Sequence, residues 1–141
     1  MTQKAVEEKI TRKGPAFKEA FSSFSTDDIE RSKEFYGGIL SLNVTESKEG
    51  LEIKFENGHN VFIYPKPDHQ PAVFTVLNLT VDDIDAAVDE LTGSGIVFEQ
   101  YGGNIKTDEK GIFRGSQNSQ GPDLAWFKDP AGNIISIIKT N

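Results

Sequence analysis

Hydrophobic and polar residues alternate along the first half of the chain in the order strand, helix and three strands. Asp27 and Asp28 provide side-chain oxygens that cap a helix start, and Glu30 completes a capping-box arrangement with Asp27. The helical pattern that follows is expected to end early, at Gly37-Gly38. Alternation typical of half-buried strands predicts the four strands of this half at 20–25, 42–46, 51–55 and 61–64.

The second half repeats this order after a connector over residues 64–71, which holds three of the six prolines and should be stiff and extended. Ile84, Ala87, Val88 and Leu91 form an i, i+3, i+4, i+7 stripe typical of an amphipathic helix. Strands of the second half are predicted at 73–81, 97–100, 123–128 and 133–139.

The two halves are related by an internal repeat. The TDDI segment at 26–29 matches VDDI at 81–84, an offset of 55 residues, whereas 58–63 matches 132–137 at an offset of 74. The second half therefore holds 19 additional residues, which the polar segment 102–122 can accommodate. A four-stranded sheet with one helix leaves one face bare, so the halves should use those faces together. The pattern predicts an α+β fold of two tandem βαβββ modules.

Three stretches of the sequence resemble the vicinal oxygen chelate superfamily, which includes glyoxalases, extradiol dioxygenases and bleomycin resistance proteins. They are DIERSKEFY at 28–36, VDDIDAAVDEL at 81–91 and FKDPAGN at 127–133. The resemblance implies two sheets curled around a cup, with helices outside, and a homodimer. It also implies one glyoxalase-like domain over residues 18–140, with an N-terminal extension at 1–17 and modules at 18–66 and 72–140.

The metal-dependent members of this superfamily hold a divalent ion in the cup, usually on His or Glu side chains. Those positions fall here on Phe21, Val76, Ser136 and either Ile63 or Tyr64. None of these side chains offers the imidazole or carboxylate that such an ion needs. We therefore expect no metal and no cofactor in the cup.

Other possible metal ligands are few. His59 and His69 are the only histidines, and both are expected to be exposed turn residues. Asp108-Glu109 offers either a loose cation site or a solvated charge pair. An enzyme that uses such nonstandard ligands, a lyase or dioxygenase of the same superfamily, is the alternative to metal-free binding.

Strand periodicity predicts which side chains line the cup, because alternate residues of a strand share a face. Leu77 and Leu79 suit the helix side, which leaves Val76, Asn78 and Thr80 facing inward. Polar residues in such a row favour either a ligand-filled cavity or hydrogen bonds across the module interface. Together with the resemblance, this predicts the following ligand-binding residues: Phe21, Ser23, Tyr64, Lys66, Val76, Asn78, Trp126, Lys128 and Ser136.

Several of these residues have a second interpretation. Tyr64, Tyr101 and Trp126 can stack on a ligand, but an aromatic side chain can equally belong to the core. Lys66 and Lys128 either contact an acidic ligand or keep the sheet edges soluble. The loop at 108–115, with its Ile-Phe pair, is either a lid over the cup or a disordered insertion.

Composition narrows the function further. The 141 residues suit one domain, and the absence of cysteine excludes disulfides, thiolate ligands and a cysteine nucleophile. A net charge of −7 argues against nucleic acid and anionic membranes as partners. No apolar run approaches the length of a membrane-spanning helix, and the first twelve residues lack the apolar core of a secretory signal, so a cytoplasmic protein is expected. Residues 1–13 form either a short helix or a charged tail.

These observations predict a small-molecule binding protein that is dimeric and metal-free and holds an apolar or aromatic ligand in its cup. No catalytic residue is assigned, and whether the protein is an enzyme stays open. A structural or regulatory dimer without a small ligand is the third hypothesis.

Overall fold

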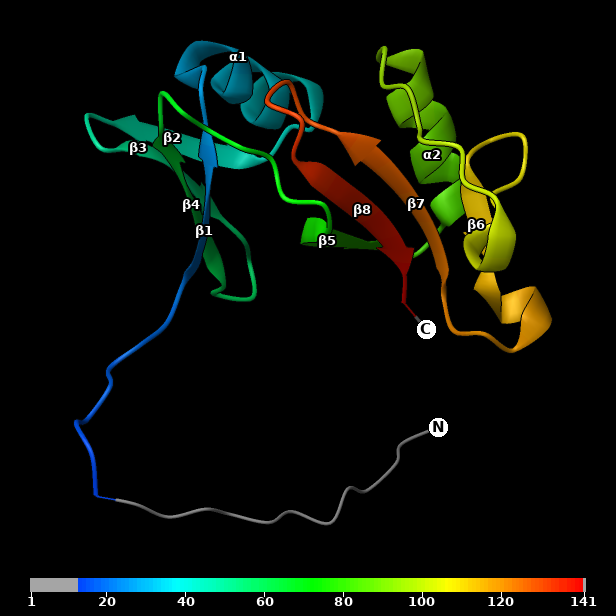
Figure 1. The fold of residues 1–141 in the computed structure, drawn as a ribbon, viewed down its shortest axis with the longest axis horizontal. Coiled ribbons are helices and arrows are strands. Elements are labelled where there is room, and N and C mark those ends of the chain that lie inside the picture. Colours follow the sequence, from blue (N-terminus) through cyan, green and yellow to red (C-terminus); the bar gives the residue numbers. More distant parts are fainter. Residues whose placement is uncertain (1–12, 141) are drawn as a thin grey trace.

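Two four-stranded sheets form the framework of the computed structural model, which describes residues 13–140 (Figure 1). Their strand orders are β1-β4-β3-β2 and β5-β8-β7-β6. In each sheet the first and last strands of the module run parallel, and the other neighbours are antiparallel. The predicted α+β fold of two βαβββ modules is confirmed. The expectation of a helix or tail over residues 1–13 lies, apart from Lys13, outside the described residues.

The first module differs from the prediction at the end of its helix. Asp28 caps α1 by accepting a hydrogen bond from the Arg31 N–H at 3.1 Å. The regular α-helix ends early, as predicted, but already at Lys33, and a π-helical segment carries the chain through Gly37-Gly38 to Ile39. Glycine weakens a helix by about 1 kcal/mol without breaking it, and the turn around it buries neighbouring aromatic residues. The elements are β1 (Ser22–Thr26), α1 (Ile29–Lys33), η1 (Glu34–Ile39), β2 (Asn43–Ser47), β3 (Gly50–Lys54) and β4 (Asn60–Pro65).

The second module contains a strand that the sequence pattern did not reveal. The predicted strand at 97–100 is wrong, because only Phe98 forms an isolated bridge, to Phe127. The fourth strand of the sheet is β6, inside the segment interpreted as an insertion; three residues are too few for alternation to be recognised. The elements are β5 (Thr75–Val81), α2 (Ile84–Gly93), η2 (Gly103–Ile105), β6 (Ile112–Arg114), η3 (Gly115–Asn118), β7 (Asp123–Lys128) and β8 (Ile134–Lys139).

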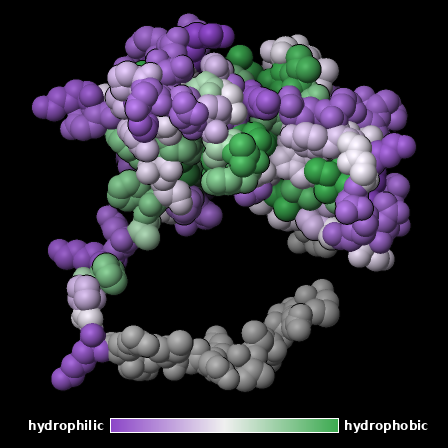
Figure 2. Space-filling model, in the orientation of Figure 1, coloured by the Kyte–Doolittle hydropathy of each residue, from purple (hydrophilic) through white to green (hydrophobic). Residues whose placement is uncertain are grey.

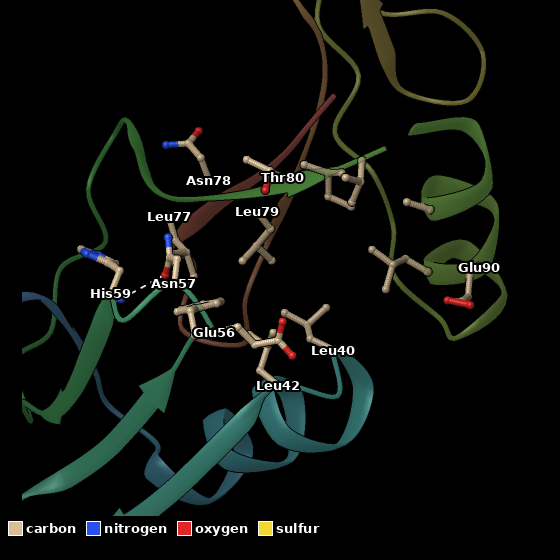
Figure 3. A pocket seen from close by; sticks show the side chains of 15 residues that line it. Leu40, Leu42, Glu56, Asn57, His59, Leu77, Asn78, Leu79, Thr80 and Glu90 are labelled. Carbon is tan, nitrogen blue, oxygen red and sulfur yellow. Dashed lines mark hydrogen bonds between the residues drawn. The ribbon is translucent and has the colours of Figure 1, made fainter. Parts of the chain in front are cut away.

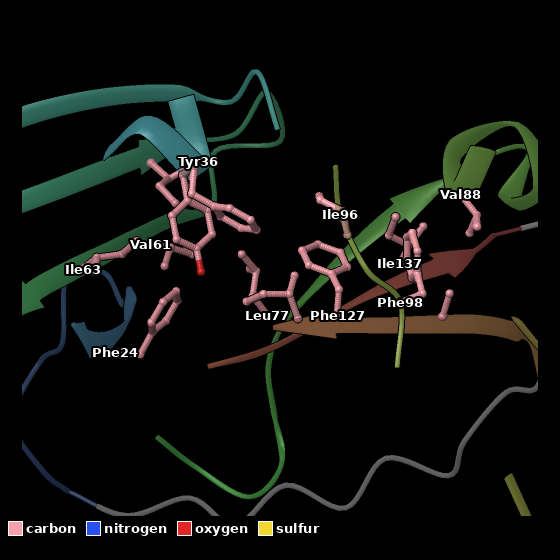
Figure 4. Close-up of a cluster of buried hydrophobic side chains, with 14 of the residues drawn as sticks. Phe24, Tyr36, Val61, Ile63, Leu77, Val88, Ile96, Phe98, Phe127 and Ile137 are labelled. Atoms are coloured by element: carbon pink, nitrogen blue, oxygen red, sulfur yellow. The ribbon is translucent and has the colours of Figure 1, made fainter. Parts of the chain in front are cut away.

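The hydrophobic core lies on the helix-covered faces of both sheets and is continuous between them (Figure 4). Leu51, Ile53 and Ile63 of the first sheet are fully buried there, as are Ile135 and Phe127 of the second. The rings of Phe35 and Phe127 meet across the module boundary, with centroids 6.0 Å apart. The two modules of one chain are therefore joined through their helix sides.

A buried polar network reinforces this junction. The Tyr36 hydroxyl donates to Asp129 Oδ2 at 2.6 Å, and Asn133 donates to the same oxygen at 2.9 Å through Nδ2. Asn133 Nδ2 also donates to the carbonyl of Ser25 at 2.9 Å. Burial, and then the neighbouring charge of Asp129, raise the pKa of Tyr36 well above its usual value. The network therefore links α1–η1, β1 and the turn before β8.

The surface combines charged flanks with a hydrophobic central region. In the view of Figure 2, hydrophobic residues gather between the two modules, and hydrophilic residues dominate both sides. Within the described part of the chain, no helix has the length and apolar character needed to cross a bilayer.

Candidate functional site

The sheet faces that the helices leave uncovered carry most of the predicted site, and we call them the cup face. On β1, Phe24 and Thr26 are buried on the helix side, whereas Ser23 is exposed and Ser25 half-buried. On β5, Leu77 is buried and Asn78 exposed. This alternation agrees with the faces assigned from the sequence.

An aromatic cluster lies on the cup face of the second sheet. Trp126 of β7 is half-buried and stands outside the hydrophobic core. The ring of Tyr101 meets it edge-on, with centroids 5.3 Å apart, and Phe113 of β6 lies at 6.4 Å on a tilt of 35°. Partial burial, and then the charge of Glu99, raise the pKa of Tyr101 above its usual value. Core packing therefore does not explain the position of Trp126.

A polar pair lies beside this cluster. Asn78, Ser136 and Trp126 occupy neighbouring positions on β5, β8 and β7. The Ser136 hydroxyl is fully buried and donates to Asn78 Oδ1. Because its oxygen is engaged in this way, exposed Asn78 presents its amide NH₂ to solvent as a donor. Ser136 thus positions Asn78 beside the aromatic rings.

A cavity of about 360 Å³, which we call the cup floor, lies where the two modules meet. Ser23 and Tyr64 line it from the first sheet, and Val76 from the second. Tyr64 is 38% exposed. The structure therefore brings these three predicted residues together, whereas Trp126, Lys128 and Ser136 lie further along the second sheet and do not line this cavity.

Three further predicted residues lie outside this cavity. Phe21 precedes β1, is 64% exposed and lines a separate hollow with Phe62. Lys66 forms an exposed ion pair with Asp68 at 2.6 Å, which raises the pKa of Lys66. Lys128 lies 3.8 Å from Glu99. Both lysines have a carboxylate neighbour that partly compensates their charge.

His69 is the side chain whose environment the sequence prediction misjudged. It is half-buried rather than exposed: Nδ1 lies 2.6 Å from Ser25 Oγ, and Nε2 lies 3.0 Å from the Ala131 carbonyl oxygen. The prolines that flank it are the signal that could have found it, because a stiff connector can hold a side chain in place. His59, by contrast, is exposed on the β3–β4 turn as expected.

The loop at 108–115 is an ordered part of the second sheet, so its interpretation as a disordered insertion is wrong. Its Arg114 donates to both carboxylate oxygens of Asp85 on α2, at 2.9 and 2.7 Å, and to Asp108 at 3.1 Å. Hydrogen bonds from Arg114 and Lys110 hold the pKa of Asp85 well below its usual range. Ile112 is fully buried. The segment is thus tied to α2 through Arg114 and Lys110, while its Phe113 lies on the cup face beside Trp126.

The side chains present do not suit a tightly bound divalent ion. The positions that the sequence resemblance implies for metal ligands hold Phe21, Val76, Ser136 and either Ile63 or Tyr64, and none of these carries an imidazole or carboxylate. Over residues 13–140, no three His, Asp or Glu side chains come together as a possible metal cluster. The cup therefore offers no donor set for such an ion.

A second cavity, of about 600 Å³, lies on the helix side of β5 and was not predicted (Figure 3). Its walls come from the end of η1, the β3–β4 turn, β5 and α2. They combine leucines with polar side chains: Leu40, Leu42, Leu77, Leu79 and Leu91 with Glu56, Asn57, His59, Asn78, Thr80 and Glu90. Because this cavity forms between the two modules, no local sequence pattern predicts it.

The chain was compared with known proteins. The family model for the Glyoxalase/Bleomycin resistance protein/Dioxygenase superfamily matches residues 21–137. The sequence has no significant match among curated proteins. Among solved structures, the antibiotic binding protein TnmS3 from Streptomyces sp. CB03234 is similar, with a TM-score of 0.63 and 20% identity over 91% of this chain and 100% of that chain.

Two other solved structures are also similar. A bleomycin-binding protein complexed with bleomycin has a TM-score of 0.62 and 18% identity, over 89% of this chain and 100% of that one. A glyoxalase/bleomycin resistance protein from Streptomyces sp. CB03234 has a TM-score of 0.55 and 21% identity, over 84% and 99%. At these identities the likeness establishes the fold.

Proposed function

Because this chain belongs to the glyoxalase/bleomycin resistance protein/dioxygenase superfamily, we propose that it binds a small aromatic molecule on the cup face without a metal ion. One fold of this kind can host many chemistries, so the site must decide between them. The side chains at the family's ligand positions favour binding over metal-assisted catalysis. Residues 18–140 form the proposed binding unit.

The aromatic cluster around Trp126 carries this proposal. Its rings are held edge-on by Tyr101 and on a tilt by Phe113, which restricts their motion before a ligand arrives. An aromatic ligand that stacks on Trp126 can accept a hydrogen bond from the Asn78 amide beside it. Similar proteins are an antibiotic binding protein and a bleomycin-binding protein, which supports a ligand of this general kind.

We further propose that the protein is a homodimer and that the second copy completes the cup. β1 and β5 lie at the edges of their sheets, and an unpaired edge strand invites pairing with another chain. Phe74, just before β5, is 66% exposed and lines the cup floor. Joining the β1 edge of one copy to the β5 edge of another would place four more strands around the ligand.

Equilibrium sedimentation tests the dimer. Phe74→Glu places a charge in the proposed interface and should shift the protein toward the monomer. Val97→Glu is the matched control, because Val97 is 81% exposed on a segment away from both edge strands. A monomeric wild-type protein, or equal effects of the two substitutions, would contradict the proposed interface.

Thermal denaturation in the presence of bleomycin and of the neutral aromatic probe N-phenyl-1-naphthylamine tests the binding site. A molecule that binds the native state adds about 2.7 kcal/mol to the free energy of unfolding at a hundred times its Kd. The melting temperature therefore rises. Trp126→Ala should abolish the rise for the probe that binds, whereas Val97→Ala should retain it. A rise that survives Trp126→Ala would place the ligand elsewhere, for instance in the cavity behind β5.

A further inference from the structure

Three separate segments contribute a serine hydroxyl, an imidazole and a carbonyl oxygen to one chain of hydrogen bonds at the cup floor. Ser25 lies on β1, next to Tyr64 of β4. His69 lies in the connector between the modules, and Ala131 lies in the turn before β8. Ser25 and His69 both line the cavity of about 360 Å³. A hydroxyl and a possible base are therefore paired beside space for a small molecule.

Each of the three groups is held by its own backbone. The Lys66 N–H donates to the Thr26 carbonyl at 2.9 Å, and the His69 N–H donates to the Lys66 carbonyl at 3.0 Å, so a turn folds His69 back over β1. Asp129 fixes the other side by accepting from the Ala131 N–H at 2.9 Å. Groups fixed by short, hydrogen-bonded segments keep their geometry better than groups on free loops.

The hydrogen bonds also determine which nitrogen of His69 carries the proton. The Ala131 carbonyl can only accept, so Nε2, at 3.0 Å, must be the protonated nitrogen. In the neutral imidazole Nδ1 is then the acceptor, and the Ser25 hydroxyl, at 2.6 Å, donates to it. Ser25 is thus hydrogen-bonded to a base whose other side is oriented by a third group, which is the arrangement of an activated serine nucleophile.

We propose that Ser25 is a nucleophile that reacts with small activated carboxylic esters entering the cup, with His69 as its general base. Ser25 Oγ forms a bond to the ester carbonyl carbon while its proton passes to His69 Nδ1. The bond from that carbon to the leaving alkoxide then breaks, and the proton on Nδ1 passes to the alkoxide, which leaves as an alcohol. The product is an ester of Ser25, and water activated by His69 releases the acid by the same route.

The surroundings indicate slow release of the acyl group. A carbonyl oxygen orients His69 where a carboxylate would stabilise the imidazolium more strongly. Ser23, Tyr64 and Gln70 line the same cavity and offer hydroxyl and amide donors near the reacting carbonyl. We therefore expect a stoichiometric acyl-protein to accumulate. This activity is independent of the proposed aromatic ligand, since Trp126 takes no part in it.

The test uses p-nitrophenyl acetate on the full chain at neutral pH, with peptide mapping by mass spectrometry. The expected result is one acetyl group per chain on Ser25, with a matching burst of p-nitrophenol. Ser22→Ala is the matched control, because Ser22 is an exposed serine on the same strand that does not line this cavity. It should label normally, and Ser25→Ala should not label at that peptide.

His69→Gln separates a base from a structural contact. Glutamine can keep a hydrogen bond to Ser25 but cannot accept its proton, so the rate of labelling should fall by about 100-fold or more. If the His69 contact only held the modules together, the rate of labelling should not fall in a variant that still folds. Labelling spread equally over Ser23, Ser25 and surface lysines of the wild-type protein, or an unchanged rate in His69→Gln, would overturn the proposal. Neither result would affect the binding of N-phenyl-1-naphthylamine.

Discussion

Replacing Tyr36 by phenylalanine should weaken the junction between the modules without disturbing the core. The side chain is fully buried, so the ring stays in place and only the hydroxyl that donates to Asp129 at 2.6 Å is lost. A hydrogen bond to a charged group is worth about 1.5–3 kcal/mol. Asp129 Oδ2 keeps its bond from Asn133 Nδ2 and is not left unpaired. We therefore expect a loss of about 2 kcal/mol.

Urea denaturation at neutral pH, followed by the fluorescence of Trp126, measures this loss. The midpoint should fall while the slope m stays constant, because the same surface is exposed on unfolding. Tyr101→Phe is the control: its hydroxyl lies on the cup face and makes no hydrogen bond among the described residues, so it should change stability by less than about 0.5 kcal/mol.

The same pair of proteins gives a pH dependence of known sign. The pKa of Tyr36 is raised in the folded state, so the neutral form is favoured there and its contribution is complete below the ordinary tyrosine pKa. Above about pH 10 the unfolded chain ionises first, and the advantage of the wild type over Tyr36→Phe should shrink as pH rises toward the folded pKa. A loss below about 0.5 kcal/mol at neutral pH, or an advantage that persists unchanged in strong alkali, would refute the reasoning.

Three further substitutions test other parts of the structure. Gly50→Ala should cost about 3 kcal/mol in urea denaturation, because φ is +147° and an added Cβ would lie 2.2 Å from the Ile63 carbonyl oxygen; a neutral effect would contradict this backbone. Asp85→Asn should cost only about 0.5–1 kcal/mol, since Asp85 is half exposed. Its folded pKa is depressed, so this cost should be complete above about pH 4 and should fade as acid titrates the wild type; a cost independent of pH would count against the ion pair. Ser136→Ala should cost about 1 kcal/mol by thermal denaturation and weaken probe binding by freeing Asn78, and an unchanged affinity would show that Asn78 needs no support.

The elements that the sequence predicted well are those whose signal is local. Asp83 caps α2 and the stripe from Ile84 onward faces the core, because capping and periodicity act within a few residues. The repeat predicted two modules because each copy carries its own local pattern of caps and strands. By contrast, β6 consists of three residues whose pairing with β7 depends on contacts formed only after the chain has folded.

The candidate site likewise combines features that local patterns predict with features that depend on long-range contacts. On β5, the alternation of buried and exposed side chains follows the faces predicted from the sequence, since it depends only on strand geometry. The position of His69 depends on a turn that returns it to β1 and on a carbonyl in the other module. The Tyr36–Asp129 bond joins residues 93 positions apart. Contacts of this range leave no pattern in a single sequence.

The most direct test of the central claim is energy transfer from Trp126 to N-phenyl-1-naphthylamine in chelator-treated protein. Trp126 is the only tryptophan, so its emission reports on the cup face alone. We expect saturable quenching of Trp126 with matching probe emission, unchanged when nickel, zinc, iron or manganese is added. Quenching that requires one of these ions, or a probe that binds without affecting Trp126, would contradict metal-free binding at this site.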